Sequence, residues 1–301
     1  MRQGRPSFSA EVMTFYRAAE SAEPESERLY YDPLAKDFLR APLRLLTRSR
    51  LVTSMAIWFF AERRAPGSVG IVLGRSRYID DCLRDCLTDG IGQLVILGAG
   101  YDSRAYRFEA LKGTVKVFEV DHPATQAVKT RKLRRLLGSL PSHVVYAPID
   151  LIKGALDKTL FESGYDRKLK TLFICEGVMY YLSAEAVDEI LAFVANNSAK
   201  GSAIVFDYFV QMTADKANES GISTKKLEQI ARSARRHGEP VTFRMRPESV
   251  GEFLSTRGFQ MRANVTAQDL KTLYFKGSSQ RRRVSAHLAV VRATVRRTPR
   301  C

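Results

Sequence analysis

Long apolar runs, cysteine and histidine are all scarce in this chain of 301 residues. The longest uninterrupted apolar run covers residues 55–61, far fewer than the ~20 residues that a membrane-spanning helix needs. The first residues lead into no apolar segment of the kind found in secretory signal peptides. We therefore expect a soluble, cytoplasmic protein without a membrane span.

Cysteine usage excludes a disulfide framework and gives no support to a metal centre. The chain has four cysteines, Cys82, Cys86, Cys175 and Cys301. Cys82 and Cys86 stand one helical turn apart, but no histidine or second cysteine pair lies nearby to complete a zinc site. We expect them to be buried and reduced, and we predict no metal site.

Acidic residues are outnumbered, with 32 against 48 basic residues and a formal net charge of +16. Such an excess favours acidic small substrates or polyanionic partners through long-range attraction, but it identifies neither. Several basic residues alternate with apolar ones in a predicted helix and are expected on its solvated face: Lys129, Arg131, Lys132, Arg134 and Arg135.

The chain length and an apolar content of 45% fit one large α/β domain. Residues 1–90 are predicted to form a helical cap, with helices over 42–64 and 68–90. Residues 91–209 alternate between strands and helices, 210–247 are a predicted helical lid insertion, and 248–301 add a helix and strands to the same sheet. Strands are predicted at residues 94–97, 115–120, 144–149, 171–175, 203–206, 259–263 and 287–293, the last two antiparallel. The expected fold is therefore a Rossmann-like, doubly wound, seven-stranded and mostly parallel sheet.

The first predicted strand ends at Gly98-Ala99-Gly100, a pattern typical of a nucleotide-binding βαβ unit. Gly98 permits a tight turn, and Gly100 lets the backbone approach a ligand closely. The third glycine of the dinucleotide fingerprint would fall where Ser103 stands. Asp102 would repel a pyrophosphate, yet it could orient the positive end of a methionine moiety. The turn therefore favours S-adenosyl-L-methionine over a nicotinamide dinucleotide.

Acidic residues stand at the expected carboxyl ends of the next four strands: Asp121, Asp150, Glu176 and Asp207. Open α/β sheets bind their ligands at this edge. Asp121 follows Gly98 by about the number of residues that is expected for an acid that binds a ribose diol. Asp150 with Leu151 is placed for adenine, and Glu176 for the aminoalkyl end of the cofactor.

Taken together and in order, these residues resemble the leucine carboxyl methyltransferase family of S-adenosylmethionine-dependent enzymes. The motifs that carry the resemblance are Arg75-Ser76-Arg77-Tyr78-Ile79-Asp80-Asp81, Gly98-Ala99-Gly100-Tyr101-Asp102-Ser103-Arg104, Phe118-Glu119-Val120-Asp121-His122-Pro123, Asp150-Leu151 and Cys175-Glu176-Gly177-Val178-Met179-Tyr180-Tyr181-Leu182. The family usually has threonine where Ser103 stands, which preserves the hydroxyl group. The basic carboxyl-terminal tail has no recognised counterpart in the family.

The resemblance implies a role for each cofactor residue. Arg75 would hold the cofactor carboxylate, with Arg77 as the competing candidate. Gly98 and Asp102 would line the methionine end, beside Gly100 of the same turn. Asp121 would bind the ribose, Asp150 and Leu151 would frame the adenine, and Glu176 would lie beneath the amino group.

The implied reaction is methyl transfer to a carboxylate or hydroxyl oxygen of a small molecule or peptide. A carboxylate is already ionised at neutral pH and needs no general base, so we name no catalytic residue. Tyr180 and Tyr181 either line the methyl-transfer end or are core or lid aromatics. An RNA-associated methyltransferase that uses the basic surface, a nicotinamide-dependent oxidoreductase and a non-catalytic binding protein stay open as alternatives, and neither the methyl acceptor nor the oligomeric state follows from the sequence.

Overall fold

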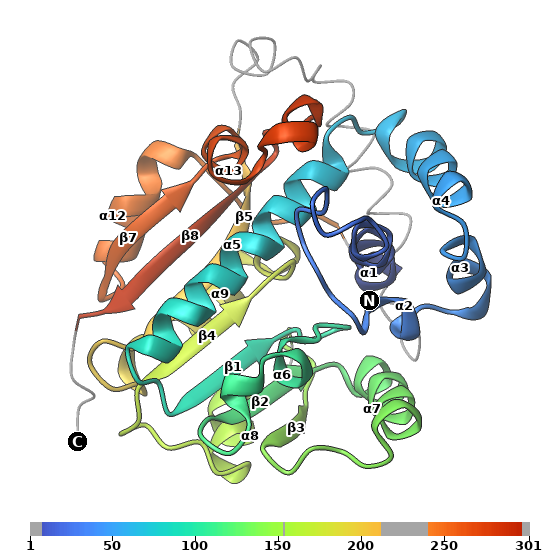
Figure 1. Cartoon of the computed structure of the whole chain (residues 1–301). Helices are drawn as coiled ribbons and strands as arrows, with labels where there is room; N and C mark the ends of the chain where they lie inside the picture. Colours follow the sequence, from blue (N-terminus) through green and yellow to red (C-terminus); the bar gives the residue numbers. More distant parts are fainter. Residues whose placement is uncertain (1–7, 153, 212–239, 297–301) are drawn as a thin grey trace.

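A computed structural model of the chain describes residues 8–152, 154–211 and 240–296. It contains one sheet with the strand order β3-β2-β1-β4-β5-β8-β7, and a short strand, β6, pairs with β5 (Figure 1). The strands are β1 (Gln93–Leu97), β2 (Lys116–Asp121), β3 (Val144–Pro148), β4 (Thr171–Cys175), β5 (Ala203–Val210), β6 (Arg244–Met245), β7 (Phe259–Val265) and β8 (Leu288–Val295).

Strands β1 to β5 are parallel, and β8 runs antiparallel between β5 and β7. The strand order reverses between β1 and β4, and such a switch point is where an open α/β sheet binds its ligand. The apolar residues of β1 are buried on both faces, which explains why its sequence is a continuous apolar run rather than an alternating one.

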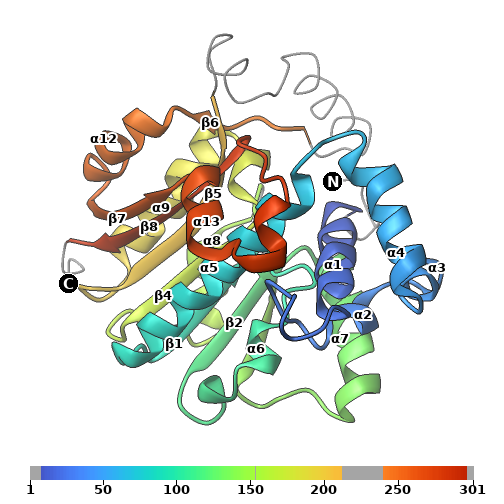
Figure 2. The same cartoon turned by 45° about the horizontal axis from the view of Figure 1, so that its top comes forward.

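Helices cover both faces of the sheet (Figures 1 and 2). Buried residues of α8 (Leu156–Glu162), α9 (Ala184–Asn196) and α12 (Val250–Ser255) pack on one face. Those of α5 (Ser68–Thr88), α6 (Arg104–Arg107), α7 (Pro123–Leu137) and α13 (Ala267–Tyr274) pack on the other. The remaining amino-terminal helices are α1 (Phe8–Ser21), α2 (Ala35–Phe38), α3 (Ala41–Leu46), α4 (Arg50–Ile57) and the π-helix η1 (Trp58–Glu62), and the short 3-10 turns are η2 (Glu109–Leu111), η3 (Met179–Tyr181), η4 (Pro247–Ser249) and η5 (Gly277–Arg281).

The predicted Rossmann-like fold is confirmed, with three differences in detail. The sheet has eight strands instead of seven, because the two residues of β6 pair with the end of β5. Strand β5 continues to Val210, so Asp207 lies inside the strand and not at its end. Strands β7 and β8 are antiparallel as predicted, but α13 stands between them in the sequence.

The predictions for the lid insertion and for the cysteines fall partly outside the described residues. Residues 212–239, most of the predicted lid insertion, lie outside the described residues. Cys82 and Cys86 are buried, as expected, and Cys175 is buried as well, while Cys301 lies outside the described residues. Within the described part of the chain, no helix combines the length and the apolar character that crossing a bilayer requires.

A carboxyl-terminal segment crosses the first turn of α5 so closely that only glycine fits beneath it. The amide of Ser285 donates to the carbonyl of Gly67, at 3.0 Å. A Cβ atom added to Gly70 would overlap the carbonyl oxygen of Arg283, which is backbone and cannot move aside alone. This contact fixes the helix that carries Arg75.

We expect Gly70→Ala to lower the free energy of unfolding by about 1–3 kcal/mol or more, because it overpacks this backbone crossing. Chemical denaturation measures the change. Gly251→Ala is the matched control, since its new methyl group would meet only the side chain of Met261 at an ordinary 3.6 Å. The control should be neutral or stabilising by up to about 1 kcal/mol. Equal stabilities of the two variants would contradict the prediction.

Candidate cofactor site

A cavity of about 410 Å³ opens at the carboxyl ends of β1 and β4. Its walls come from the turn after β1, the end of β2, the loops after β3 and β4, and α1 of the amino-terminal cap. All eight cofactor residues that the sequence predicts line it: Arg75, Gly98, Gly100, Asp102, Asp121, Asp150, Leu151 and Glu176. The fold therefore brings the predicted set together.

The glycine turn has the backbone conformation that its sequence predicts. Gly98 and Gly100 have φ angles of +65° and +42°, which side chains with a Cβ rarely adopt. A Cβ atom on Gly98 would also overlap the side chain of Val178 from the loop after β4. Glycine at these positions thus lets Val178 and Ala10 pack directly against the turn.

Asp121 connects this turn to the end of β2. One carboxylate oxygen accepts the amide of Gly100 at 2.7 Å, and the other accepts the amide of His122 at 2.7 Å. Burial raises the pKa of Asp121, an effect that these amides partly offset. Each oxygen keeps a lone pair for a further donor, as binding a diol requires.

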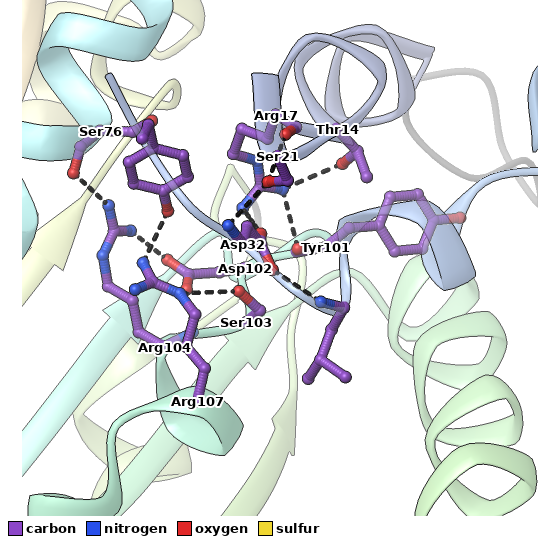
Figure 3. Close-up of polar contacts among 12 residues, drawn as sticks. Thr14, Arg17, Ser21, Asp32, Ser76, Tyr101, Asp102, Ser103, Arg104 and Arg107 are labelled. Atoms are coloured by element: carbon purple, nitrogen blue, oxygen red, sulfur yellow. Dashed lines mark hydrogen bonds and ion pairs between the residues drawn. The ribbon is translucent and has the colours of Figure 1, made fainter. Parts of the chain in front are cut away.

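Arg104 lies at the centre of the buried ionic network beside the cavity, although the sequence analysis gave it no role. Its Nη1 donates to Asp102 at 2.5 Å and to Glu176 at 2.8 Å, and its Nε donates to Asp80 at 2.7 Å. Figure 3 shows Arg104 between Asp102 and Ser76. A guanidinium group has five donors in a fixed planar arrangement, against three on a lysine ammonium group, and can therefore serve more carboxylates at once.

Glu176 accepts donors at both oxygens while its side chain stays 15% exposed to the cavity. One oxygen accepts Nε of Arg75 at 3.0 Å and the hydroxyl of Ser76 at 2.6 Å. Burial alone would raise the pKa of Glu176, but Arg104 and Arg75 together hold it far below its ordinary value. Glu176 is therefore a permanent anion. For Asp102 too, burial opposes ionisation, and Arg104 and Lys129 still lower its pKa.

The structure distinguishes the two arginines that the sequence left as competitors. Arg75 lines the cavity, and its Nη1 also donates to Asp207 at 2.5 Å. Arg77 does not line it; its guanidinium group contacts Asp81 at 3.4 Å and the carbonyl of Leu29 at 3.3 Å instead. Of the two, Arg75 alone is placed to meet a bound ligand.

Arg17 is a second arginine of the cavity, and the sequence analysis missed it. It comes from α1, pairs with Asp32 at 3.0 Å, and donates to the carbonyl of Tyr101 at 2.8 Å (Figure 3). The apolar and small residues around it could have marked a helix buried on several sides: Phe15, Tyr16, Ala18 and Ala19. No motif in the sequence connects Arg17 to a glycine turn that lies so much later in the chain.

Lys129 corrects the prediction that the basic residues of 123–137 lie on a solvated face. Its side chain is 1% exposed, and its Nζ donates to Glu119 at 2.8 Å and contacts the carbonyl of Ala99 at 3.4 Å. Burial raises the pKa of Glu119 to about 7, although Lys129 opposes the rise. Lys132 is also partly buried and donates to the carbonyls of Phe38 and Leu39. Lys129 therefore supports the glycine turn from below.

Aromatic and small side chains also line the cavity. Tyr180 and Tyr181 are among them, with ring centroids 4.5 Å apart, together with Ser9, Ala10 and Met13 of α1. His122 also lines the cavity, and its Nδ1 accepts the amide of Ala124 as the N-cap of α7. Fold and site together define the class of protein: a Rossmann-like α/β protein with a small-molecule cavity at the switch point of its sheet.

Comparisons with known proteins agree with this class. The model of the leucine carboxyl methyltransferase family matches residues 10–195. A Bacillus subtilis protein named "Putative S-adenosyl-L-methionine-dependent methyltransferase YktD" is 27% identical over 91% of this chain and 93% of its own length. A relative with the same description from Mycolicibacterium vanbaalenii is 35% identical over 66% of this chain and 65% of its own. A crystal structure of a DUF574 family protein from Streptomyces avermitilis, 14% identical, covers 97% of this chain and 98% of that one with a TM-score of 0.61, and so supports the fold.

The chain belongs to the leucine carboxyl methyltransferase family and is an S-adenosylmethionine-dependent methyltransferase. The resemblance read from its motifs is thereby confirmed. The alternatives that the sequence left open, an RNA-associated methyltransferase, a nicotinamide-dependent oxidoreductase and a non-catalytic binding protein, are not favoured by these relatives.

Removing the guanidinium group of Arg104 should destabilise the whole fold. We expect Arg104→Ala to lower the free energy of unfolding by about 3–5 kcal/mol, because three buried carboxylates lose a partner. Denaturant titration measures the effect. Arg84→Ala is the matched control, since it removes only surface contacts, the pair with Asp81 and the contact with the ring of Phe108, and should change stability by no more than about 1 kcal/mol. An Arg104→Ala protein as stable as the control would refute the role of the network.

Proposed function

We propose that the chain methylates an oxygen atom, a carboxylate before a hydroxyl, on a small molecule or peptide. The observation that carries this proposal is the composition of the cavity: its described lining combines the predicted groups for S-adenosylmethionine with the aromatic side chains of Tyr180 and Tyr181. When bound, the cofactor supplies an electrophilic methyl group. The chain's own residues would bind and orient the cofactor and the acceptor, and they would exclude water from the cavity.

The predicted cofactor residues that line the cavity fit S-adenosylmethionine. A cavity of about 410 Å³ is in the range of small-molecule sites. Gly98 and Gly100 line the cavity with backbone alone, in the positive-φ turn that such a cofactor site uses. We assign the ribose to Asp121, the adenine to Asp150 and Leu151, and the amino group to Glu176 and Asp102. Arg75 and Arg17 are the guanidinium groups for the cofactor carboxylate.

The other lining residues support a carboxylate acceptor over a hydroxyl acceptor. A hydroxyl group needs a base to accept its proton, whereas a carboxylate is ionised at neutral pH. Burial raises the pKa of Tyr180 well above its ordinary value, so its phenol stays protonated and is not a base that could accept the proton of a hydroxyl group. His122 already uses its Nδ1 as a helix cap. Catalysis by alignment in a water-excluding cavity can supply about 7–11 kcal/mol in favourable cases.

The assignment of Asp121 can be tested by calorimetric titration with S-adenosylmethionine. We expect Asp121→Ala to weaken binding about 10- to 100-fold, because a charged hydrogen-bond acceptor for two hydroxyl groups is lost. Asp188→Ala removes an exposed carboxylate that pairs with Arg257, and it should bind like the wild type. Unchanged affinity in Asp121→Ala would contradict the assignment, and binding of NAD in preference would contradict the cofactor.

The chemistry of the acceptor can be tested with methyl-labelled cofactor and cell extract. If the acceptor is a carboxylate, the label enters a product that releases methanol in mild alkali, because esters hydrolyse there and ethers do not. The same incubation with Asp121→Ala should give much less labelled product at low cofactor concentration. An alkali-stable label would exclude the carboxylate, and a label removed by ribonuclease would favour the RNA alternative.

A further inference from the structure

Helix α4 and the π-helix η1 expose an apolar surface where an ordinary surface helix is polar. Leu51, Met55 and Trp58 follow one another at helical spacing, and their exposed fractions are 72%, 63% and 59%. Val52, Phe59 and Phe60 are exposed beside them. We call these six residues the outer patch. Exposed apolar residues gathered in this way mark an interaction surface more often than scattered ones do.

The inner side of the same segment accounts for its folding, so the outer patch is not needed for the core. Ala56, Ile57 and Ala61 pack in a cluster with residues of α1, and Thr53 is buried. Figures 1 and 2 both show α3 and α4 at the outer margin of the molecule, with α1 between them and the sheet. The patch therefore faces away from the body of the protein.

Arginine surrounds the outer patch. Residues 41–64 contain five arginines and one acid: Arg44, Arg48, Arg50, Arg63, Arg64 and Glu62. Arg50 is paired with Glu23 and Glu27, so the other four arginines carry the positive charge around the outer patch. Glu62 accepts the amides of Gly67 and Val69, so its charge is directed inward. The guanidinium groups of Arg63 and Arg64 lie 5.5 Å and 5.9 Å from the ring centroid of Phe59. The outer patch is thus an apolar surface with a positive rim.

We propose that the outer patch docks on an anionic lipid surface. Tryptophan, phenylalanine and leucine on one helical face, rimmed by arginine, are the features of helices that lie in the membrane interface. Anionic headgroups would compensate the arginines, whereas a second copy would bring like charges together. Docking in the interface needs no membrane-spanning helix, and it is independent of the proposed methyl acceptor.

The presence of one tryptophan in the chain makes the proposal directly measurable, because the emission of Trp58 reports on the outer patch. Mixing the protein with vesicles of phosphatidylcholine and phosphatidylglycerol in equal parts should shift the emission to shorter wavelength and shield Trp58 from acrylamide. Binding should weaken with salt and should be at least about tenfold weaker on phosphatidylcholine alone, since each basic residue contributes about a fivefold change on anionic lipid.

Variants separate the apolar and the charged contributions. Leu51→Ser combined with Met55→Ser should weaken vesicle binding at least about tenfold, because much apolar area is lost. Leu273→Ser, at a residue 52% exposed on α13, is the matched control and should bind like the wild type. Arg48→Gln should reduce the preference for anionic vesicles about fivefold.

Three results would overturn the proposal. One is an emission of Trp58 that the anionic vesicles leave unchanged. Another is equal loss of binding in Leu273→Ser and in the Leu51, Met55 double variant. The third is a Trp58 that is shielded from acrylamide before vesicles are added; analytical ultracentrifugation would then show whether a second copy or the same chain covers the outer patch.

Discussion

Carboxylates gathered at one edge of a buried sheet must be neutralised, and this constraint governs the structure around the cavity. An uncompensated buried carboxylate is so costly that it takes up a proton or moves into water. Arg104 and Arg75 prevent both by joining Asp80, Asp102, Glu176 and Asp207 into one network. Because these side chains come from α5, α6, β5 and the loops after β1 and β4, the charge pairing also fixes how those elements pack.

The glycine turn is held from two sides by cations that do not belong to it. Lys129 contacts the carbonyl of Ala99 from α7, and Arg17 donates to the carbonyl of Tyr101 from α1. Carbonyl groups in a tight turn lack partners within regular structure, so donors from elsewhere stabilise the conformation. The amino-terminal cap is consequently part of the cofactor site through Arg17, and its position depends on the turn that it covers.

The sequence predicted best what depends on local patterns. The residues of β1, the positive φ of Gly98 and Gly100, and the clustering of Asp121, Asp150 and Glu176 all follow from strand periodicity and from the rule that parallel strands end together. The sequence-based prediction was wrong where an ion-pair partner lies on another element. Lys129 was predicted on a solvated helix face because nothing in the local sequence indicates that Glu119 lies opposite it. Asp207 was predicted at the end of a strand, whereas it lies inside β5 and pairs with Arg75. Arg75 is 132 residues away in sequence, so no local pattern indicates this pairing.

The buried pairs also clarify where the net charge of +16 acts. An ion pair such as Lys129 with Glu119 is neutral overall, so internal pairing consumes none of the basic excess. The excess therefore lies outside these pairs, as in the arginines around the outer patch. Its field decays over about 8 Å at physiological ionic strength, which separates it from an acceptor already inside the cavity. Attraction to an anionic surface and recognition of the methyl acceptor are thus two different properties of the chain, and a mutation that reverses one can leave the other intact.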